Sequence, residues 1–189
     1  MMKQILLSSV TLLALLFICG PKTSLTASAD GKTTDPSLPS PKMTISGTVT
    51  QSDAYSGGVK PTEERLKRLT APRAFPGKKF HVIKGNTNTI AREIVLSFTT
   101  GEAGNFTFQL LPGTYAILVD EQVSSPDAKK YQTKSITVDE TAFNQWWAKP
   151  YQLLDVKATN ITDLKFHFQH RSFIPYDIPP LRYTGPYPP

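Results

Sequence analysis

The chain has 189 residues, of which 39% are hydrophobic and 10% aromatic, which is enough for one domain with a sizeable core. Its formal net charge is +6, but an expected leader over residues 1–29 holds two lysines and no acid, which leaves 19 basic residues against 15 acidic ones. This mild excess gives no reason to expect nucleic-acid binding. The single cysteine, Cys19, excludes an internal disulfide and a thiolate metal site.

Residues 1–29 have the pattern of a signal peptide. Lys3 precedes an apolar run over residues 5–18 that is too short to span a bilayer. Cleavage after Ala29, which ends a small-x-small site, would release a secreted chain. Cys19 is placed where a lipoprotein carries its lipidated cysteine, although Ile18 departs from the small residue expected before it. We keep both fates, and an uncleaved leader, open. Secretion and lipid anchoring both predict an extracytoplasmic location, and membrane attachment is expected only through the lipid.

A polar, proline-containing linker over residues 30–42 leads to the first expected strand, residues 43–50, in which Gly47 indicates a bulge or a close approach. Residues 51–78 then form an insertion with a short helix over 61–69, where Leu66 and Leu69 would make the contact stripe. The span 60–84 carries eight Lys or Arg against two Glu. Two interpretations remain for it: a solvated surface, or a surface for an acidic partner or anionic saccharide.

The stretch TTGEAGNFTFQLLPGTYAILVD, residues 99–120, carries the clearest strand signal. Phe106, Phe108 and Leu110 alternate with polar residues, Pro112-Gly113 makes a turn, and alternation resumes at Tyr115. Together with the strand expected before residue 99, this pattern predicts a three-stranded antiparallel meander.

Further strands are expected before and after the meander, with a helix among them. The strands are 79–84, 134–138, 151–157 and 161–170, and the helix is 141–148. Seven or eight strands predict an all-β sandwich over residues 43–170. Residues 171–189 are rich in proline and aromatic side chains and predict an extended C-terminal strap.

The runs ISGTV at 45–49, FTTGEAGNFTF at 98–108 and LPGTY at 111–115 resemble the carboxypeptidase regulatory-like domain. The resemblance covers about residues 43–125. It implies a Greek-key, prealbumin-like sandwich of about seven strands. The insertion at 51–78 and everything after residue 130 depart from the family pattern, and these regions carry the one or two short helical insertions. It also implies a non-catalytic accessory role on secreted and envelope proteins.

The prealbumin-like architecture also includes an enzyme family, the transthyretin-like hydroxyisourate hydrolases, which end in a Tyr-Arg-Gly-Ser signature. This chain reads Tyr183-Thr184-Gly185 there and lacks the arginine. His167 and His170 are three apart, which on a strand places them on opposite faces. We therefore expect no catalytic residue, no cofactor and no metal ligand, and a chain that is not an enzyme.

Candidate binding residues are the aromatic side chains outside the minimal sandwich, namely Trp146, Trp147, Tyr176, Tyr183 and Tyr187. Trp147 shares a helical face with Phe143 and is expected to dock the helix. Trp146 lies about 100° away and either packs or stacks on a sugar ring or partner peptide. The leading hypothesis is a non-catalytic module for protein interaction or scaffolding at the cell envelope, and the alternative is a carbohydrate-binding module. The partner, a protein or a glycan, is unknown.

Extracytoplasmic location gives the first testable prediction. Cell fractionation should recover the chain outside the cytosol and without its leader. Labelling with a radioactive fatty acid, for the natural chain and for Cys19→Ser, separates lipid anchoring from cleavage after Ala29. A full-length chain in the cytosol would contradict the prediction.

Overall fold

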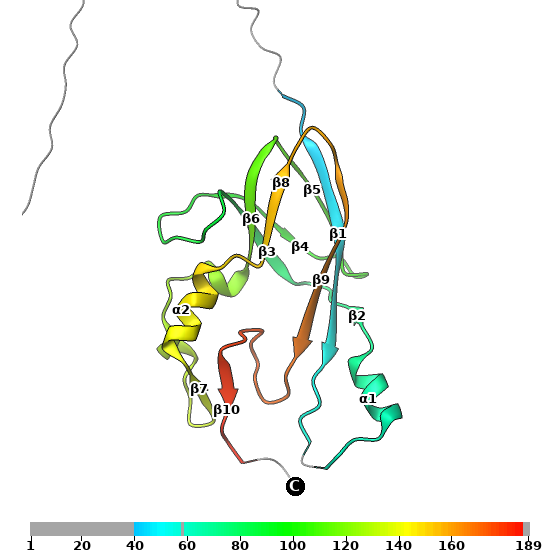
Figure 1. Cartoon of the computed structure of the whole chain (residues 1–189), viewed down its shortest axis with the longest axis vertical. Helices are drawn as coiled ribbons and strands as arrows, with labels where there is room; N and C mark the ends of the chain where they lie inside the picture. The colour runs from blue at the N-terminus through cyan, green and yellow to red at the C-terminus, as the bar shows by residue number, and fades with distance from the viewer. Residues whose placement is uncertain (1–39, 58, 187–189) are drawn as a thin grey trace, which may run out of the picture. The chain divides into compact units, whose positions relative to one another are not determined.

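The computed structural model describes residues 40–57 and 59–186. The expected leader with Cys19, most of the linker, and Tyr187 lie outside the described residues. The described chain is an all-β sandwich with two α-helices, which confirms the predicted fold class (Figure 1). In chain order the elements are β1 (Met43–Asp53), α1 (Glu63–Thr70), β2 (Arg73–Ala74), β3 (Lys79–Lys84), β4 (Ile94–Thr99), β5 (Asn105–Leu110), β6 (Gly113–Val119), the 3-10 helices η1 (Asp120–Gln122) and η2 (Ala128–Tyr131), β7 (Ile136–Val138), α2 (Glu140–Ala148), β8 (Gln152–Val156), β9 (Ile161–His170) and β10 (Leu181–Tyr183).

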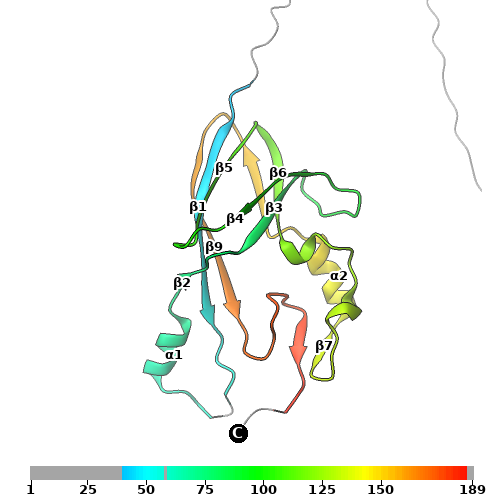
Figure 2. The ribbon, with the colours of Figure 1, turned by 180° about the vertical axis from the view of Figure 1, so that it is seen from behind.

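Two sheets form the sandwich. In one, β1 pairs with β5 and the short β2 in antiparallel fashion and with β9 in parallel. The other has the antiparallel order β4-β3-β6-β8. A separate ribbon pairs β7 with β10. Figure 1 shows β1 and β9 side by side, and Figure 2 shows the same pair from behind.

The parallel pairing of β1 and β9 depends on Gly47. A Cβ atom at this position would lie 2.2 Å from the carbonyl oxygen of Leu164, a distance that no side chain tolerates. The register shifts between Ile45 and Gly47, as a bulge requires. The predicted bulge with close approach is therefore confirmed.

The predicted meander is wrong. β4 and β6 both pair with β3, whereas β5 pairs with β1 in the opposite sheet. The turns at each end of β5 thus carry the chain from one sheet to the other. A strand with one apolar face has the same alternation whether its neighbour in sequence lies beside it or across the core, so the pattern could not distinguish the two arrangements.

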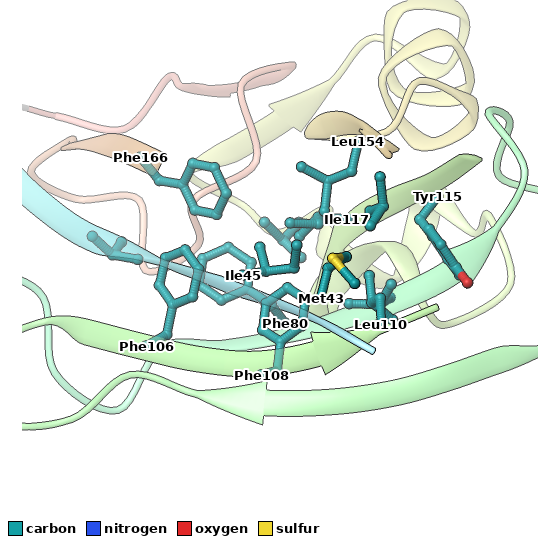
Figure 3. Close-up of a cluster of buried hydrophobic side chains, with 14 of the residues drawn as sticks. Met43, Ile45, Phe80, Phe106, Phe108, Leu110, Tyr115, Ile117, Leu154 and Phe166 are labelled. Carbon is teal, nitrogen blue, oxygen red and sulfur yellow. The ribbon is translucent and has the colours of Figure 1, made fainter. Parts of the chain in front are cut away.

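Aromatic side chains from both sheets fill the main core (Figure 3). Phe80 of β3 is fully buried, and its ring stacks on Phe98 at 5.2 Å between centroids. It also contacts Phe166 and Phe168 of β9 at 5.6 and 6.0 Å. These contacts join the two sheets across the sandwich, and burial of such rings is the largest source of stability available to the described chain.

The C-terminal strap is a folded part of the molecule. Its strand β10 pairs with β7, and three strap residues, Ile174, Ile178 and Leu181, are buried in a second apolar cluster with Phe143 of α2. The Arg171 guanidinium donates hydrogen bonds to the carbonyls of residues 178, 179 and 181 at 2.5, 3.1 and 2.8 Å. This bonding supplies partners to a proline-rich backbone that cannot form a full ladder.

Helix α1 lies in the insertion and has no buried residue. Thr62 caps its first turn by accepting a hydrogen bond from the Arg65 N–H at 3.3 Å. Leu66 is 42% exposed and Leu69 is half-buried, so the expected contact stripe is wrong for Leu66.

The core assignment of β5 gives a second prediction. Phe106→Ala should lower the free energy of unfolding by about 3–5 kcal/mol because it empties a packed site between the sheets. Gln109→Ala, an exposed position on the same strand, is the matched control and should change it by less than about 0.5 kcal/mol. Urea denaturation measures both variants, and equal midpoints would contradict the assignment.

Candidate ligand-binding cleft

Helix α2 brings Trp146 to the junction of the sandwich and the strap. The Asp139 carboxylate caps the helix by accepting from the Ala142 N–H at 3.0 Å. Phe143 and Trp147 are buried on one face, as the spacing predicts. Trp146 is half-buried and packs against both apolar clusters, with its ring 5.5 Å from that of Phe143.

A buried glutamine and a buried asparagine fix the C-terminal end of α2. The Gln122 amide donates hydrogen bonds to the carbonyls of Trp146 and Lys149, both at 2.8 Å. The Asn88 amide donates to the carbonyl of Trp147 at 2.8 Å, and its backbone N–H donates to that of Ala148 at 3.2 Å. Carbonyls at a helix end have no partner within the helix, so these two residues satisfy them and hold Trp146 in place.

Trp146 lines a cleft of about 410 Å³, which we call the Trp146 cleft. This volume lies within the range of about 300–1,000 Å³ typical of small-ligand sites. The residues around it come from β6, η1, α2, the loop between α2 and β8, β9 and the strap. They are Val119, Gln122, Trp146, Lys149, Pro150, Tyr151, His167, Phe168, Gln169, Arg171, Asp177 and Pro179.

The aromatic part of the cleft is rigid. The Tyr151 ring stacks on Phe168 at 4.9 Å, and its hydroxyl donates to the carbonyl of His167 at 3.1 Å. Burial is the main cause that raises the pKa of the Tyr151 hydroxyl above its usual value. The ring therefore acts as a neutral wall of the cleft.

Several polar groups of the cleft already have partners. Arg171 is bound to strap carbonyls, and burial lowers the pKa of its guanidinium from the usual value. Asp177 pairs with Lys78, and the ring nitrogens of His167 lie 3.0 Å from the hydroxyls of Thr50 and Ser52. The exposed side chains of Lys149 and Gln169 make no hydrogen bond to the described residues, so they are the groups available to a ligand.

The remaining candidate residues lie in different settings. Trp147 is 6% exposed, its indole N–H donates to the carbonyl of Ser124 at 2.7 Å, and the Arg92 guanidinium lies over its ring. Tyr176 is 39% exposed and meets Tyr131 edge-on, and Tyr183 is half-buried and stacks on Phe173. The structure thus brings only Trp146 of the five into the cleft; Tyr187 is outside the described residues.

Sequence reasoning missed the groups that fix the cleft. Gln122 and Asn88 are 1% and 2% exposed, yet each lies in an irregular stretch without a periodic pattern. A signal existed in the Gly85-Asn86-Thr87-Asn88 turn, since asparagine favours turns, but nothing local indicated that Asn88 reaches a helix end.

The basic span 60–84 is partly neutralised in the fold. Arg73 forms a bidentate pair with Asp53 at 2.7 and 2.9 Å, which is the main cause that lowers the pKa of that carboxyl. Lys78 and Lys79 pair with acids as well. The basic residues of α1 stay exposed.

A set of hydrogen bonds centred on His81 lies on the outer face of the sheet that contains β3, β4 and β6. His81 places Nδ1 2.7 Å from the Ser97 hydroxyl and Nε2 2.7 Å from the Asp120 carboxylate. A ring held in this way could polarise a hydroxyl, but Ser97 is exposed on the sheet and does not line the Trp146 cleft. These hydrogen bonds link β3 and β4 to the first residue of η1. Within the described part of the molecule, no three His, Cys, Asp or Glu side chains gather to hold a metal ion.

The comparisons with known proteins give no family. No protein-family model matches the chain, and no curated protein matches it. No helix among the described residues is long and apolar enough to cross a membrane.

Three solved structures are similar to parts of the chain. The Bacillus anthracis TIE protein shares 12% identity at a TM-score of 0.33, over 68% of this chain and 17% of that one. Shaft pilin SpaA from Lactobacillus rhamnosus GG shares 9% identity at a TM-score of 0.34, over 69% of this chain and 50% of that one. The N-terminal domain of the same pilin shares 7% identity at a TM-score of 0.33, over 72% of this chain and 99% of that one. The chain thus spans about a sixth of the TIE protein and half of the longer pilin structure. Similarity at this level identifies no activity.

The hydrogen bonds of His81 give a third prediction. The hydrogen bond from His81, with a smaller contribution from Lys79, lowers the pKa of the Asp120 carboxyl below its usual value. A lowered folded-state pKa adds stability that is present above the unfolded pKa of about 4, and this stability is lost as the pH falls through the folded-state pKa. Between these two values, the natural chain should therefore lose stability more steeply than Asp120→Asn.

Urea denaturation across this acid range measures the difference. Asp155→Asn is the control, because Asp155 is exposed and its contact with Lys157 is 3.8 Å long. If the free energy of unfolding fell equally steeply with decreasing pH for the natural chain and for Asp120→Asn, the prediction would be contradicted.

Proposed function

We propose that the chain is a non-catalytic, extracytoplasmic binding module and that the Trp146 cleft takes a saccharide. The cleft carries the proposal: a fixed indole and a neutral tyrosine ring stand beside the unpaired side chains of Lys149 and Gln169. A sugar ring offers C–H groups to an aromatic face and hydroxyls to an amide and an ammonium. The leader supports the extracytoplasmic setting.

The contacts of Trp146 preorganise the cleft for binding. Trp146 is held through the backbone of α2 by Gln122, so its ring is positioned before a ligand arrives. Preorganisation of this kind lowers the entropic cost of binding. The acid of the cleft, Asp177, and its guanidinium, Arg171, already have partners within the protein, so neither is free to exchange a proton with a ligand.

Protein interaction remains a second candidate, supported by the outer face of the β4-β3-β6-β8 sheet. The register aligns Ile94, Ile83, Ala116 and Leu153 in one row across the four strands. The two ends of this row, Ile94 and Leu153, are 40% and 52% exposed. Ile83 and Ala116 between them are fully buried, so the apolar surface offered to a protein partner is that of Ile94 and Leu153 at the two ends, and burying it would remove it from water.

Glycan retention tests the first proposal. The double variant Lys149→Ala with Gln169→Ala should lower retention on a glycan array by roughly 10-fold or more, equivalent to about 1.4 kcal/mol. Its melting temperature should stay near that of the natural chain, because both side chains are exposed. Lys165→Ala, an exposed change on β9 outside the cleft, is the matched control.

The two candidates respond to different variants. Leu153→Ser should leave glycan retention intact and reduce capture of a protein partner. If no glycan on the array is retained by the natural chain, or if the double variant binds as well as it does, the saccharide proposal is wrong. Trp147→Ala should unfold the module and serves as the stability reference.

A further inference from the structure

The junction between the strap and the sandwich holds a lysine closed off between two carboxylates. Lys78 directly precedes β3, and its side chain is 10% exposed. Its Nζ atom lies 3.0 Å from Oδ2 of Asp177 and 3.1 Å from Oε1 of Glu121. The acids are themselves only 17% and 20% exposed. Only the folded chain brings the three together, since Asp177 lies 99 residues from Lys78.

The surroundings of this ammonium are aromatic. Nζ lies 5.1 Å from the centre of the Phe168 ring and 5.7 Å from that of Phe75. Removing an ammonium and a carboxylate from water is costly, and their mutual attraction repays this cost only in part. A product in which both charges vanish would remove the cost.

We propose that Lys78 and Asp177 condense to an intramolecular amide, with Glu121 carrying the protons. The three side chains are the ones that such a reaction requires: an amine, a carboxyl carbon to accept it, and a second acid that touches the amine. This proposal is independent of any ligand in the Trp146 cleft.

The reaction balances without a co-reactant. Glu121 takes a proton from the Lys78 ammonium, and the freed lone pair attacks Cγ of Asp177. Glu121 gives that proton to an Asp177 oxygen and then relays a second one from the nitrogen to the same oxygen. The C–O bond breaks, its electrons leave with the oxygen as water, and one C–N bond remains. Glu121 is a carboxylate again at the end of the reaction.

Contact geometry assigns the roles of the two acids. Glu121 approaches Nζ with both oxygens, at 3.1 and 3.5 Å, which suits an acid that takes and returns the protons of the amine. Asp177 meets Nζ through a single oxygen at 3.0 Å, and the proposal makes its carboxyl the group that accepts the amine. Nζ and the Asp177 carboxylate are held in contact, 3.0 Å apart at Oδ2, and such positioning raises the effective concentration of the reacting groups.

Intact-mass measurement of the purified, denatured chain tests the proposal. The natural chain should be lighter, by one water molecule, than its sequence and its determined N-terminus require. Lys78→Met and Asp177→Ala should have full mass. Glu121→Gln keeps the side-chain shape but cannot carry a proton, so it should also have full mass. Lys79→Met, which removes the neighbouring lysine, is the matched control and should still be lighter by one water molecule.

Tryptic digestion of the natural chain locates the bond, whether or not a variant folds. We expect one branched product that joins the peptide of Lys78 to that of Asp177, with no cleavage after Lys78. A natural chain of full mass overturns the proposal. A loss of one water that persists in Lys78→Met also overturns the proposal, because it would come from another reaction, such as succinimide formation at Asp30-Gly31. A branched product in Glu121→Gln overturns the role of Glu121.

Discussion

The parallel contact between β1 and β9 is the constraint on which the rest of the molecule depends. It places the first and last long strands side by side, and it exists only because Gly47 presents no side chain to Leu164. The pairing continues as far as Asp53 and His170, so β9 ends beside the end of β1. The strap must therefore start there and fold back toward α2. The Trp146 cleft and the Lys78 cluster both arise from this return.

Local patterns were a good guide to the elements and a poor guide to their partners. The bounds of β3 and β9 and the alternation of β5 were predicted from the sequence. β5 and β9 each have one buried face, whereas β3 is buried on both faces. The assignment of β4, β5 and β6 to a single meander was wrong, since alternation states which face is buried but not which sheet the strand joins. The strands β2 and β10 were missed because two or three residues carry no period.

Local sequence patterns also revealed only some of the residues that form the Trp146 cleft. Trp146 was singled out because it falls beside the face defined by Phe143 and Trp147. Gln122 and Asn88 were not, since their role depends on where the end of α2 lies in space. Lys78 was counted as part of a basic surface, and only the fold reveals that it is enclosed by two acids and two rings. Residues that act through distant contacts leave no trace in a local pattern.

The direction of β1 and β9 also decides how the module would respond to tension. Both strands run the same way, so the chain enters β1 at one end of the sandwich and leaves β9 at the other (Figure 1). A pull between the linker before β1 and the end of β9 would act along the strands in opposite directions. The slanted hydrogen bonds between them would then be loaded together in shear and not opened one after another. Separating the two strands in this direction would require many hydrogen bonds to break at once.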